Sequence, residues 1–221
     1  MQKIKNNTFE LIPLYGRVAI YSIVVMNVIV YYGSRLFTRS MYHFNFTSSL
    51  DDSIPFVPAF ILVYTVVAYG QWFYGYILSA RECRRTVMFI FGSELVAKTI
   101  CMMIFFALPT TMDRGIVNDT NIFGVMVGLL YSTDTPDNLF PSIHCLESYL
   151  LLRTVPLLKN APVWYKRITP LVTLLVFASV LLVKQHVVLD VLGAIIVTEI
   201  GMLVMKCIVK VFNNNIKRAE I

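Results

Sequence analysis

Two histidines in separate segments of the chain are the residues best suited to chemistry. His144 lies in LFPSIHCL, residues 139–146, and His186 lies in KQHVVLD, residues 184–190. Asp190 follows His186 by four residues, a spacing that places an imidazole and a carboxylate on one face of a helix. The sequence therefore predicts a histidine that is oriented by an aspartate, with a second histidine to work beside it.

A pair of histidines with cations nearby suits phosphoryl transfer. In that chemistry His186 is the nucleophile through its far ring nitrogen, while Asp190 accepts the near N–H, fixes the tautomer and stabilises developing positive charge. Pro141 is expected to open a helix with His144 just inside its start. There His144 can protonate the leaving oxygen.

Three further residues are expected to bind the phosphate. Lys184 and Arg114 neutralise its oxygens. The hydroxyl of Ser142 joins the free backbone N–H groups and the positive dipole end at the start of the same helix, which is a ready anion site.

The composition of the chain predicts an integral membrane protein. Of its 221 residues, 57% are hydrophobic and only 14% are charged, and the mean hydropathy is +0.69. A soluble domain of this size cannot bury that much apolar surface. In such a chain a net charge of +6 is typical of basic cytoplasmic loops, so nucleic acid is not expected as a partner.

The cysteines and carboxylates give no sign of a metal site. Four cysteines, at positions 83, 101, 145 and 207, have no C-x-x-C spacing, so neither a disulfide framework nor a zinc site is expected. No acidic cluster or further ligand set accompanies the two histidines. The sequence therefore predicts a site that works without a metal and without a cofactor.

Six segments are expected to cross the membrane, as one all-α domain over residues 1–221. The fourth carries His144, Glu147 and Arg153, so hydropathy alone would miss it. The predicted spans are 18–34, 54–79, 86–108, 140–158, 168–183 and 187–212. A shorter apolar piece, 122–130, is expected to lie at the interface or against the bundle.

Basic residues are divided unevenly between the two ends of this predicted bundle. One end collects most of the lysines and arginines and is expected to be cytoplasmic, together with both termini. The other end keeps only Arg35, Arg39, Arg114 and Lys184. Because both histidines also fall at that end, the candidate site is expected at the outer face of the cell membrane.

Two segments resemble motifs of the type 2 phosphatidic acid phosphatase superfamily. PSIH at 141–144 looks like its Pro-Ser-Gly-His motif, and residues 179–190 are similar to its Ser-Arg-x5-His-x3-Asp motif. Ser179 keeps the required distance of seven residues to the histidine, although Val180 stands in place of arginine. This resemblance implies that Ser179 binds phosphate. KQH at 184–186 resembles the branch that includes the inositol phosphotransferases of sphingolipid synthesis.

A third motif resembles that family in degenerate form. LPTTMDRG at 108–115 keeps Arg114 of the Lys-x6-Arg-Pro motif but has Gly115 for proline, and the nearest upstream lysine, Lys98, is sixteen residues away. The resemblance covers residues 86–205. It implies a six-helix plan and a metal-independent phosphohistidine mechanism on a lipid phosphate or diphosphate.

Three charged residues inside the predicted spans have both a structural and a functional interpretation. Glu94 and Lys98 are four residues apart, as in a helical ion pair. The functional alternative is that Lys98 reaches up to the phosphate, although it lies ~15 Å from the end of its helix at 1.5 Å per residue. Glu147, one turn after His144, either hydrogen-bonds a site residue or pairs with Lys98 across the bundle.

The function predicted from these observations is a lipid phosphatase of the cell membrane. It hydrolyses a phosphate mono- or diphosphate ester of a lipid through a phosphohistidine on His186. A first alternative is a lipid phosphotransferase, in which an alcohol replaces water. A second is a non-enzymatic transporter or scaffold, and a third is a family member that has lost catalysis, as the eroded third motif suggests. The oligomeric state is left open.

Overall fold

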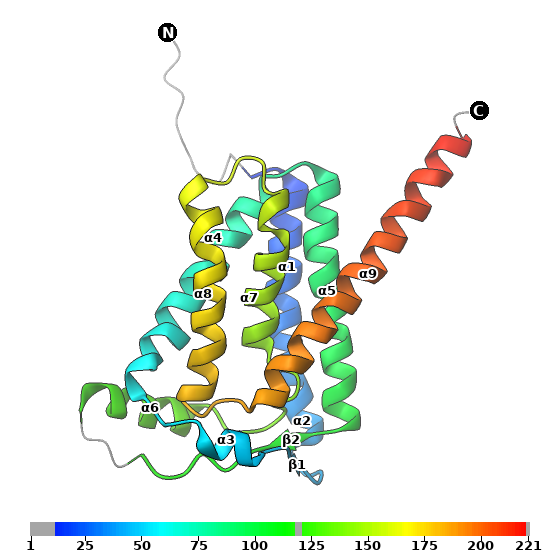
Figure 1. The fold of residues 1–221 in the computed structure, drawn as a ribbon. Helices are drawn as coiled ribbons and strands as arrows, with labels where there is room; N and C mark the ends of the chain where they lie inside the picture. The colour runs from blue at the N-terminus through cyan, green and yellow to red at the C-terminus, as the bar shows by residue number, and fades with distance from the viewer. Residues whose placement is uncertain (1–11, 118–120, 220–221) are drawn as a thin grey trace.

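The computed structural model describes residues 12–117 and 121–219, with side chains to residue 210. Helices α1, α4, α5, α7, α8 and α9 run along one another as a bundle, and the start of α1 lies at the same end as the close of α9 (Figure 1). The helix bounds are α1 Leu14–Val28, α2 Ser34–Thr38, α3 Ser49–Ser53, α4 Ala68–Ala80, α5 Arg84–Ala107, α6 Ile122–Thr133, α7 Ile143–Thr154, α8 Val163–Leu182 and α9 Val188–Ala219.

Five helices in the described part of the chain are long and apolar enough to cross a membrane. They are Leu14–Thr38, Pro58–Ala80, Arg84–Ala107, Val163–Leu182 and Val188–Lys210. The prediction of an all-α, multi-pass membrane protein is thereby confirmed in its class. The first helix is longer than the predicted 18–34, because α1 continues through a π-helical turn, Ile29–Gly33, into α2.

The helix that carries His144 is shorter than predicted. Instead of spanning 140–158 it begins at Ile143, because Ser142 is its N-cap, and its last turn becomes a 3-10 turn, Val155–Leu157. The prediction that Pro141 opens the helix is therefore wrong by two residues. Helix α7 packs against α4, α5, α8 and α9. It is thus enclosed by other helices rather than by lipid.

The connection before α8 is also more helical than predicted. We expected the span to begin at 168, but α8 begins at Val163, directly after Pro162. Proline lacks an N–H and is well tolerated just before a helix begins. Residues Val163 to Arg167 are consequently helix rather than loop.

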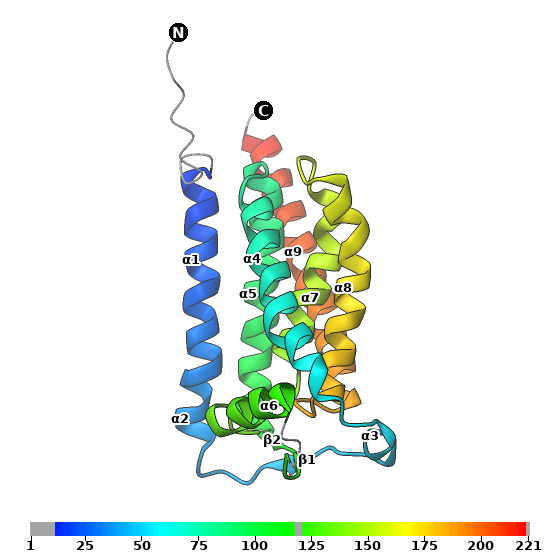
Figure 2. The same cartoon turned by 90° about the vertical axis from the view of Figure 1, so that its left-hand side faces the viewer.

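Short elements close the end of the bundle opposite to the start of α1 (Figure 2). Strands β1, Phe44–Asn45, and β2, Thr110–Thr111, pair in parallel with Phe44 opposite Thr110. Helix α6, which contains the apolar piece 122–130, lies across this end and buries Val127 in the core. Helix α3 lies at the same end, beside the start of α9.

Helices α5 and α9 form the most extensive pairing in the bundle, and glycine allows their close approach. A Cβ at Gly201 would lie 2.5 Å from the carbonyl oxygen of Ser93, and a Cβ at Gly193 would lie 2.4 Å from the ring of Phe140. Small residues allow membrane helices to approach closely. The second contact holds the segment before α7 against α9, and so fixes the distance between the two predicted histidines.

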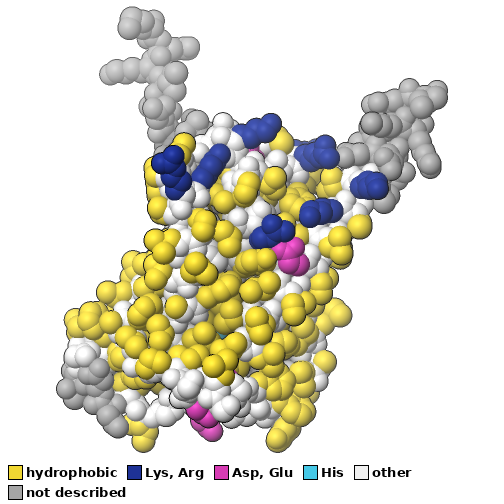
Figure 3. All heavy atoms as spheres, in the orientation of Figure 1, with side chains coloured by type: hydrophobic (Ala, Val, Ile, Leu, Met, Phe, Trp, Pro, Cys, Tyr) yellow, Lys and Arg dark blue, Asp and Glu magenta, His cyan; other side chains and the backbone are white. Residues whose placement is uncertain are grey.

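The charges on the surface are sorted along the bundle. Lys and Arg side chains gather at the end where α1 starts, above a broad apolar belt (Figure 3). Six basic residues at that end lie in the connecting loops or in the first turns of α5 and α8, namely Arg81, Arg84, Arg85, Lys159, Lys166 and Arg167. The end closed by α3 and α6 has far fewer exposed cations.

Candidate active site

His186 and Asp190 are joined by a hydrogen bond at the start of α9. Nδ1 of His186 lies 3.1 Å from Oδ2 of Asp190, and the same oxygen accepts the backbone N–H of Val187 at 3.0 Å. Asp190 is 1% exposed, so its carboxylate is held almost entirely by the protein. Because Nδ1 faces the carboxylate, it carries the proton, and Nε2 is the ring nitrogen left for chemistry.

The turn that leads to His186 is a Schellman motif. The N–H of Gln185 donates to the carbonyl of Val180 at 2.9 Å, and the N–H of Lys184 donates to that of Leu181 at 3.2 Å. Lys184 has a φ of 50°, the left-handed conformation that this position usually gives to glycine. A lysine at such a position indicates that its side chain offsets the backbone strain.

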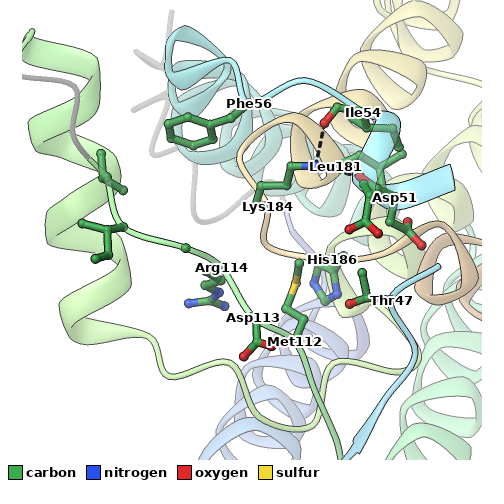
Figure 4. Close-up of a pocket in the computed structure, with 14 residues that line it drawn as sticks. Thr47, Asp51, Ile54, Phe56, Met112, Asp113, Arg114, Leu181, Lys184 and His186 are labelled. Atoms are coloured by element: carbon green, nitrogen blue, oxygen red, sulfur yellow. Dashed lines mark hydrogen bonds between the residues drawn. The ribbon is translucent and has the colours of Figure 1, made fainter. Parts of the chain in front are cut away.

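The ammonium of Lys184 binds backbone rather than an open site. Nζ donates to the carbonyls of Asp51 at 2.8 Å and Ile54 at 2.6 Å, at the end of α3 (Figure 4). Lys184 was predicted to bind phosphate. The structure puts it on the wall of a cavity beside His186, with two of its three hydrogens already committed.

The carboxylate of Asp51 connects α3 to the start of α9. Its Oδ1 accepts the N–H of Val188, the first residue of α9, at 2.7 Å. Its Oδ2 accepts the N–H of Ser48 at 2.9 Å as part of a capping box. Burial by itself raises the pKa of Asp51. The hydrogen bonds from Ser48 and Val188, together with nearby Lys184, outweigh burial and leave that pKa below its usual value.

His144 is enclosed by aromatic rings. It stacks on Tyr64 with ring centroids 4.4 Å apart and an interplanar angle of 19°, and the edge contact with Trp72 has a centroid distance of 5.1 Å. Its Nε2 is buried and has no hydrogen-bond partner among the described residues. The centroids of His144 and His186 are 6.2 Å apart, so the fold brings the two predicted histidines together.

Arg114 lies beside this pair and is held by three groups. It donates to the carbonyl of Asp134 and, at 2.8 Å, to Oε1 of Gln185, and its guanidinium lies 5.1 Å from the ring centroid of Tyr131. Its side chain is 5% exposed, and its Nε has no partner in the described structure. Arg114 is thus a buried cation with a free donor, as phosphate binding requires.

Gln185 adds a second buried donor that the sequence analysis missed. It is 1% exposed, and its Nε2 has no partner among the residues described. The guanidinium of Arg114 can only donate hydrogen bonds, so the amide atom that faces it must be the acceptor Oε1. The amide atom that is left for the cavity is therefore the donor Nε2. A buried amide that lacks a partner carries a free-energy penalty of about 1–3 kcal/mol, which a bound ligand removes.

Two cavities meet at Arg114 and His186. The larger, of about 600 Å³, lies between α1–α2 and α4 and is also lined by His144, Gln185 and Glu147. The smaller, of about 340 Å³, lies under α3 and the loop after β2 (Figure 4). Charged and apolar side chains share its walls, whereas the larger cavity is mainly apolar and is lined by several Tyr, Phe and Trp rings.

The two predicted serines do not reach either cavity. Ser142 caps α7 by accepting the N–H of Cys145 at 3.3 Å, and its own N–H donates to the carbonyl of Asp190 at 3.1 Å. Ser179 is fully buried and donates to the carbonyl of Val176 at 2.8 Å. Ser142 therefore fixes α7 against α9, while Ser179 serves its own helix.

Lys98 belongs to a buried ion network that borders the larger cavity at Glu147. Its Nζ lies 2.6 Å from Oε1 of Glu94 and 2.6 Å from Oε1 of Glu147, and Tyr76 donates to Glu94 at 2.6 Å. Lys98 and Glu94 are fully buried. Both structural interpretations of the sequence are realised together, since the ammonium is shared between the helical partner and Glu147 on α7.

Comparison with protein families, curated proteins and solved structures finds no match to this chain. In the part of the chain that the structure describes, no group of three or more His, Cys, Asp and Glu residues is placed to hold a metal ion.

Proposed function

We propose that the protein is a membrane lipid phosphatase that hydrolyses a phosphate mono- or diphosphate ester of a lipid through a phosphohistidine on His186. One observation carries the proposal. The His186–Asp190 pair faces a cavity into which a buried guanidinium, Arg114, and a buried amide, Gln185, both bring unpartnered N–H groups. This is the donor set that an oxyanion of phosphate would satisfy.

The proposed reaction has two steps. Nε2 of His186 attacks phosphorus, an N–P bond forms, and the P–O bond to the lipid alcohol breaks with its electron pair on oxygen. His144 gives that oxygen a proton, and Asp190 balances the positive charge on His186. Water, deprotonated by His144, then attacks phosphorus, the N–P bond breaks, and phosphate leaves with His186 restored.

His144 is neutral in this scheme until the substrate binds. No carboxylate contacts its ring in the described structure, and the aromatic rings around it exclude water. Such surroundings disfavour a charged imidazole. A phosphate that binds with its proton passes that proton to His144 and supplies the negative charge that the imidazolium needs, so the acid forms only when there is a leaving group to protonate.

The shape of the larger cavity supports a lipid substrate. Tyr32, Tyr69 and Phe73 line it from α1–α2 and α4, and they are 62%, 56% and 71% exposed on the apolar surface of the bundle. An opening bordered by such side chains admits acyl chains from the bilayer. The phosphate then reaches Arg114 and His186 at the inner end of the cavity.

We further propose that α7 is the sixth crossing and that the site faces outward. A helix enclosed by α4, α5, α8 and α9 does not need the length or hydropathy of a lipid-facing span. The cluster of Lys and Arg at the end where α1 starts favours a cytoplasmic position for that end, together with the end of α9 (Figure 3). His186 lies at the other end.

The test is phosphate release from lipid phosphates by the purified protein in detergent with EDTA. Phosphatidic acid and a lipid diphosphate are the substrates, and wild type is compared with His186→Ala and His144→Ala. His43→Ala is the matched control, because His43 is the third histidine, is partly exposed, and has its one hydrogen bond among the described residues to the carbonyl of Met41. We expect release by wild type and His43→Ala, and at least a thousand-fold loss in His186→Ala.

Three results would contradict the proposal. Release that requires an added metal would exclude the phosphohistidine mechanism. No release with water or with added acceptor alcohols, combined with altered lipid movement in His186→Ala, would favour a transporter. Release only in the presence of an acceptor alcohol would identify the phosphotransferase instead.

A further inference from the structure

The larger cavity has polar residues on its walls that the proposed mechanism does not use. Glu147 lines it from α7, three residues after His144, and Asn27 lines it from α1. At 1.5 Å per residue Glu147 lies ~4.5 Å further along α7 than His144, on a similar face of the helix. The carboxylate of Glu147 therefore lies deeper in the bundle than the histidines.

One oxygen of Glu147 is left for the cavity. The side chain is 3% exposed, and its Oε1 lies 2.6 Å from Nζ of Lys98. Its Oε2 has no hydrogen bond to any described residue. A buried carboxylate oxygen that lacks a donor is destabilising, so a ligand that donates to it gains affinity.

Asn27 brings a second unbonded group to the same cavity. Its Oδ1 is buried and has no partner among the described residues. The amide nitrogen also has no hydrogen bond to the described part of the chain. An amide can donate as well as accept, whereas a carboxylate only accepts. A hydroxyl, which also does both, can thus donate to Glu147 and bond to Asn27.

The charges around Lys98 strengthen the demand for a donor. Glu94 and Glu147 share its single ammonium, so the three ionised side chains carry one uncompensated negative charge. Ionisable groups inside a membrane bundle are costly and usually mark a function. Glu147 is the carboxylate of this network that lines the larger cavity. Its free oxygen is where the excess charge meets a ligand.

We infer that Glu147 and Asn27 are specificity-determining residues, which bind a hydroxyl on the carbon next to the phosphate ester of the lipid alcohol. The inference rests on the proposed function, because it places phosphorus at His186 and the leaving oxygen at His144. Long side chains on a helix lean toward its start, so the carboxylate of Glu147 leans toward the leaving oxygen. An acyl ester at the same carbon has no proton to donate.

The experiment compares two lipids that differ in one hydroxyl. 1-Acyl lysophosphatidic acid has a free hydroxyl on the carbon next to its phosphate ester, and the 2-deoxy analogue with the same acyl chain has none. Phosphate release from each is measured with the purified protein in detergent with EDTA. We expect kcat/KM for the hydroxylated lipid to exceed that for the analogue by about ten-fold or more, because the analogue loses a hydrogen bond to a charged acceptor.

The variants separate the cavity oxygen from the ion network. Glu147→Met should lower the ratio by about five-fold or more. Glu94→Met is the matched control, because each substitution leaves Lys98 paired with one carboxylate, but only Glu147 lines the cavity. It should leave the ratio unchanged. Asn27→Leu lies outside the network and should lower the ratio about three-fold, so the test does not depend on the folding of the network variants.

Equal kcat/KM for the two lipids would overturn the inference and leave the proposed function standing, since water rather than substrate would then satisfy the free oxygen. A ratio that survives both Glu147→Met and Asn27→Leu would overturn it as well. So would an equal fall in Glu94→Met and Glu147→Met, because the preference would then come from the network. No phosphate release from either lipid or from phosphatidic acid would contradict the proposed function together with the inference.

Discussion

Nδ1 of His186 lies 3.1 Å from Oδ2 of Asp190, one helical turn further along the chain, and the carboxylate is buried. The bond decides which ring nitrogen can act, because it keeps the proton on Nδ1 and leaves Nε2 at the junction of two cavities.

Replacement of this carboxylate by an amide should remove activity without unfolding the protein. In Asp190→Asn a single amide atom faces both Nδ1 of His186 and the N–H of Val187. As oxygen it still accepts both bonds but brings no negative charge to balance a positive His186, and as nitrogen it favours the wrong tautomer of His186. We expect kcat to fall by about 10³- to 10⁴-fold, as in other histidines that lose an orienting aspartate. Steady-state kinetics and a thermal unfolding curve check both parts. Activity within ten-fold of wild type would contradict the assigned role of Asp190.

Lys184 should matter for stability through two opposing contributions. Lys184→Ala loses both hydrogen bonds to the carbonyls at the end of α3 but keeps the left-handed backbone strain. Lys184→Gly loses the same bonds and removes the strain, so it should be more stable than Lys184→Ala by ~1 kcal/mol. Unfolding in detergent measures the difference. An alanine variant at least as stable as the glycine variant would show that the turn is not strained.

The attachment of α3 to α9 should weaken in acid. The folded-state pKa of Asp51 is below its usual value, so the ionised form stabilises the fold. That contribution is fully present above the unfolded-state pKa of about 3.9 and is lost as the pH falls through the lower folded-state value. The difference in unfolding midpoint between wild type and Asp51→Asn should therefore be constant from pH 7 to 5 and shrink below pH ~4. A difference that grows in acid would contradict this assignment.

The ion network around Lys98 should be structural. Lys98→Met leaves Glu94 and Glu147 facing each other without a cation, and loss of one partner from a buried pair reduces the free energy of unfolding by about 3–5 kcal/mol. Arg153→Met breaks the half-exposed pair with Glu199 and should lower it by less than ~1 kcal/mol. Thermal unfolding of both variants gives the comparison. A Lys98→Met protein that is stable but fails to bind phosphate would place Lys98 in the site after all.

Short-range spacing predicted the parts of the site that lie on one helix. Four residues separate His186 from Asp190, and four separate Glu94 from Lys98, and in both cases the side chains meet. The approach of His144 to His186 also followed from topology, since it required only that both segments lie at one end of the bundle.

Features that depend on tertiary contacts were not predictable. Gln185 was overlooked because nothing in a single sequence tells that an amide is buried opposite Arg114. Ser142 was placed in the site because it lies at a helix start and Ser179 because of its position in a motif, but their hydroxyls bond to their own helices. The length of α7 was overestimated because we expected a helix long enough to span the membrane against lipid. Four surrounding helices hold α7 in place instead, so it can be shorter.

The role of α3 had a local signal that could have been used. Ser48 and Asp51 form a capping box, which the spacing S-x-x-D predicts. The bond from Asp51 to the start of α9, and each of the two bonds from Lys184 to α3, joins residues that are more than a hundred positions apart in the sequence. Only the folded chain reveals that this short helix closes the cavity beside His186.

The most direct measurement is to trap the phosphoenzyme. Wild-type protein is mixed with lipid phosphate labelled in its phosphorus, quenched in alkali within one turnover, digested and examined by mass spectrometry. Phosphate should be found on the peptide that contains His186, should be stable in alkali and released by acid, and should be absent from His186→Ala. Steady turnover of the lipid with no phosphate on His186, or turnover that persists in His186→Ala, would contradict the proposed mechanism.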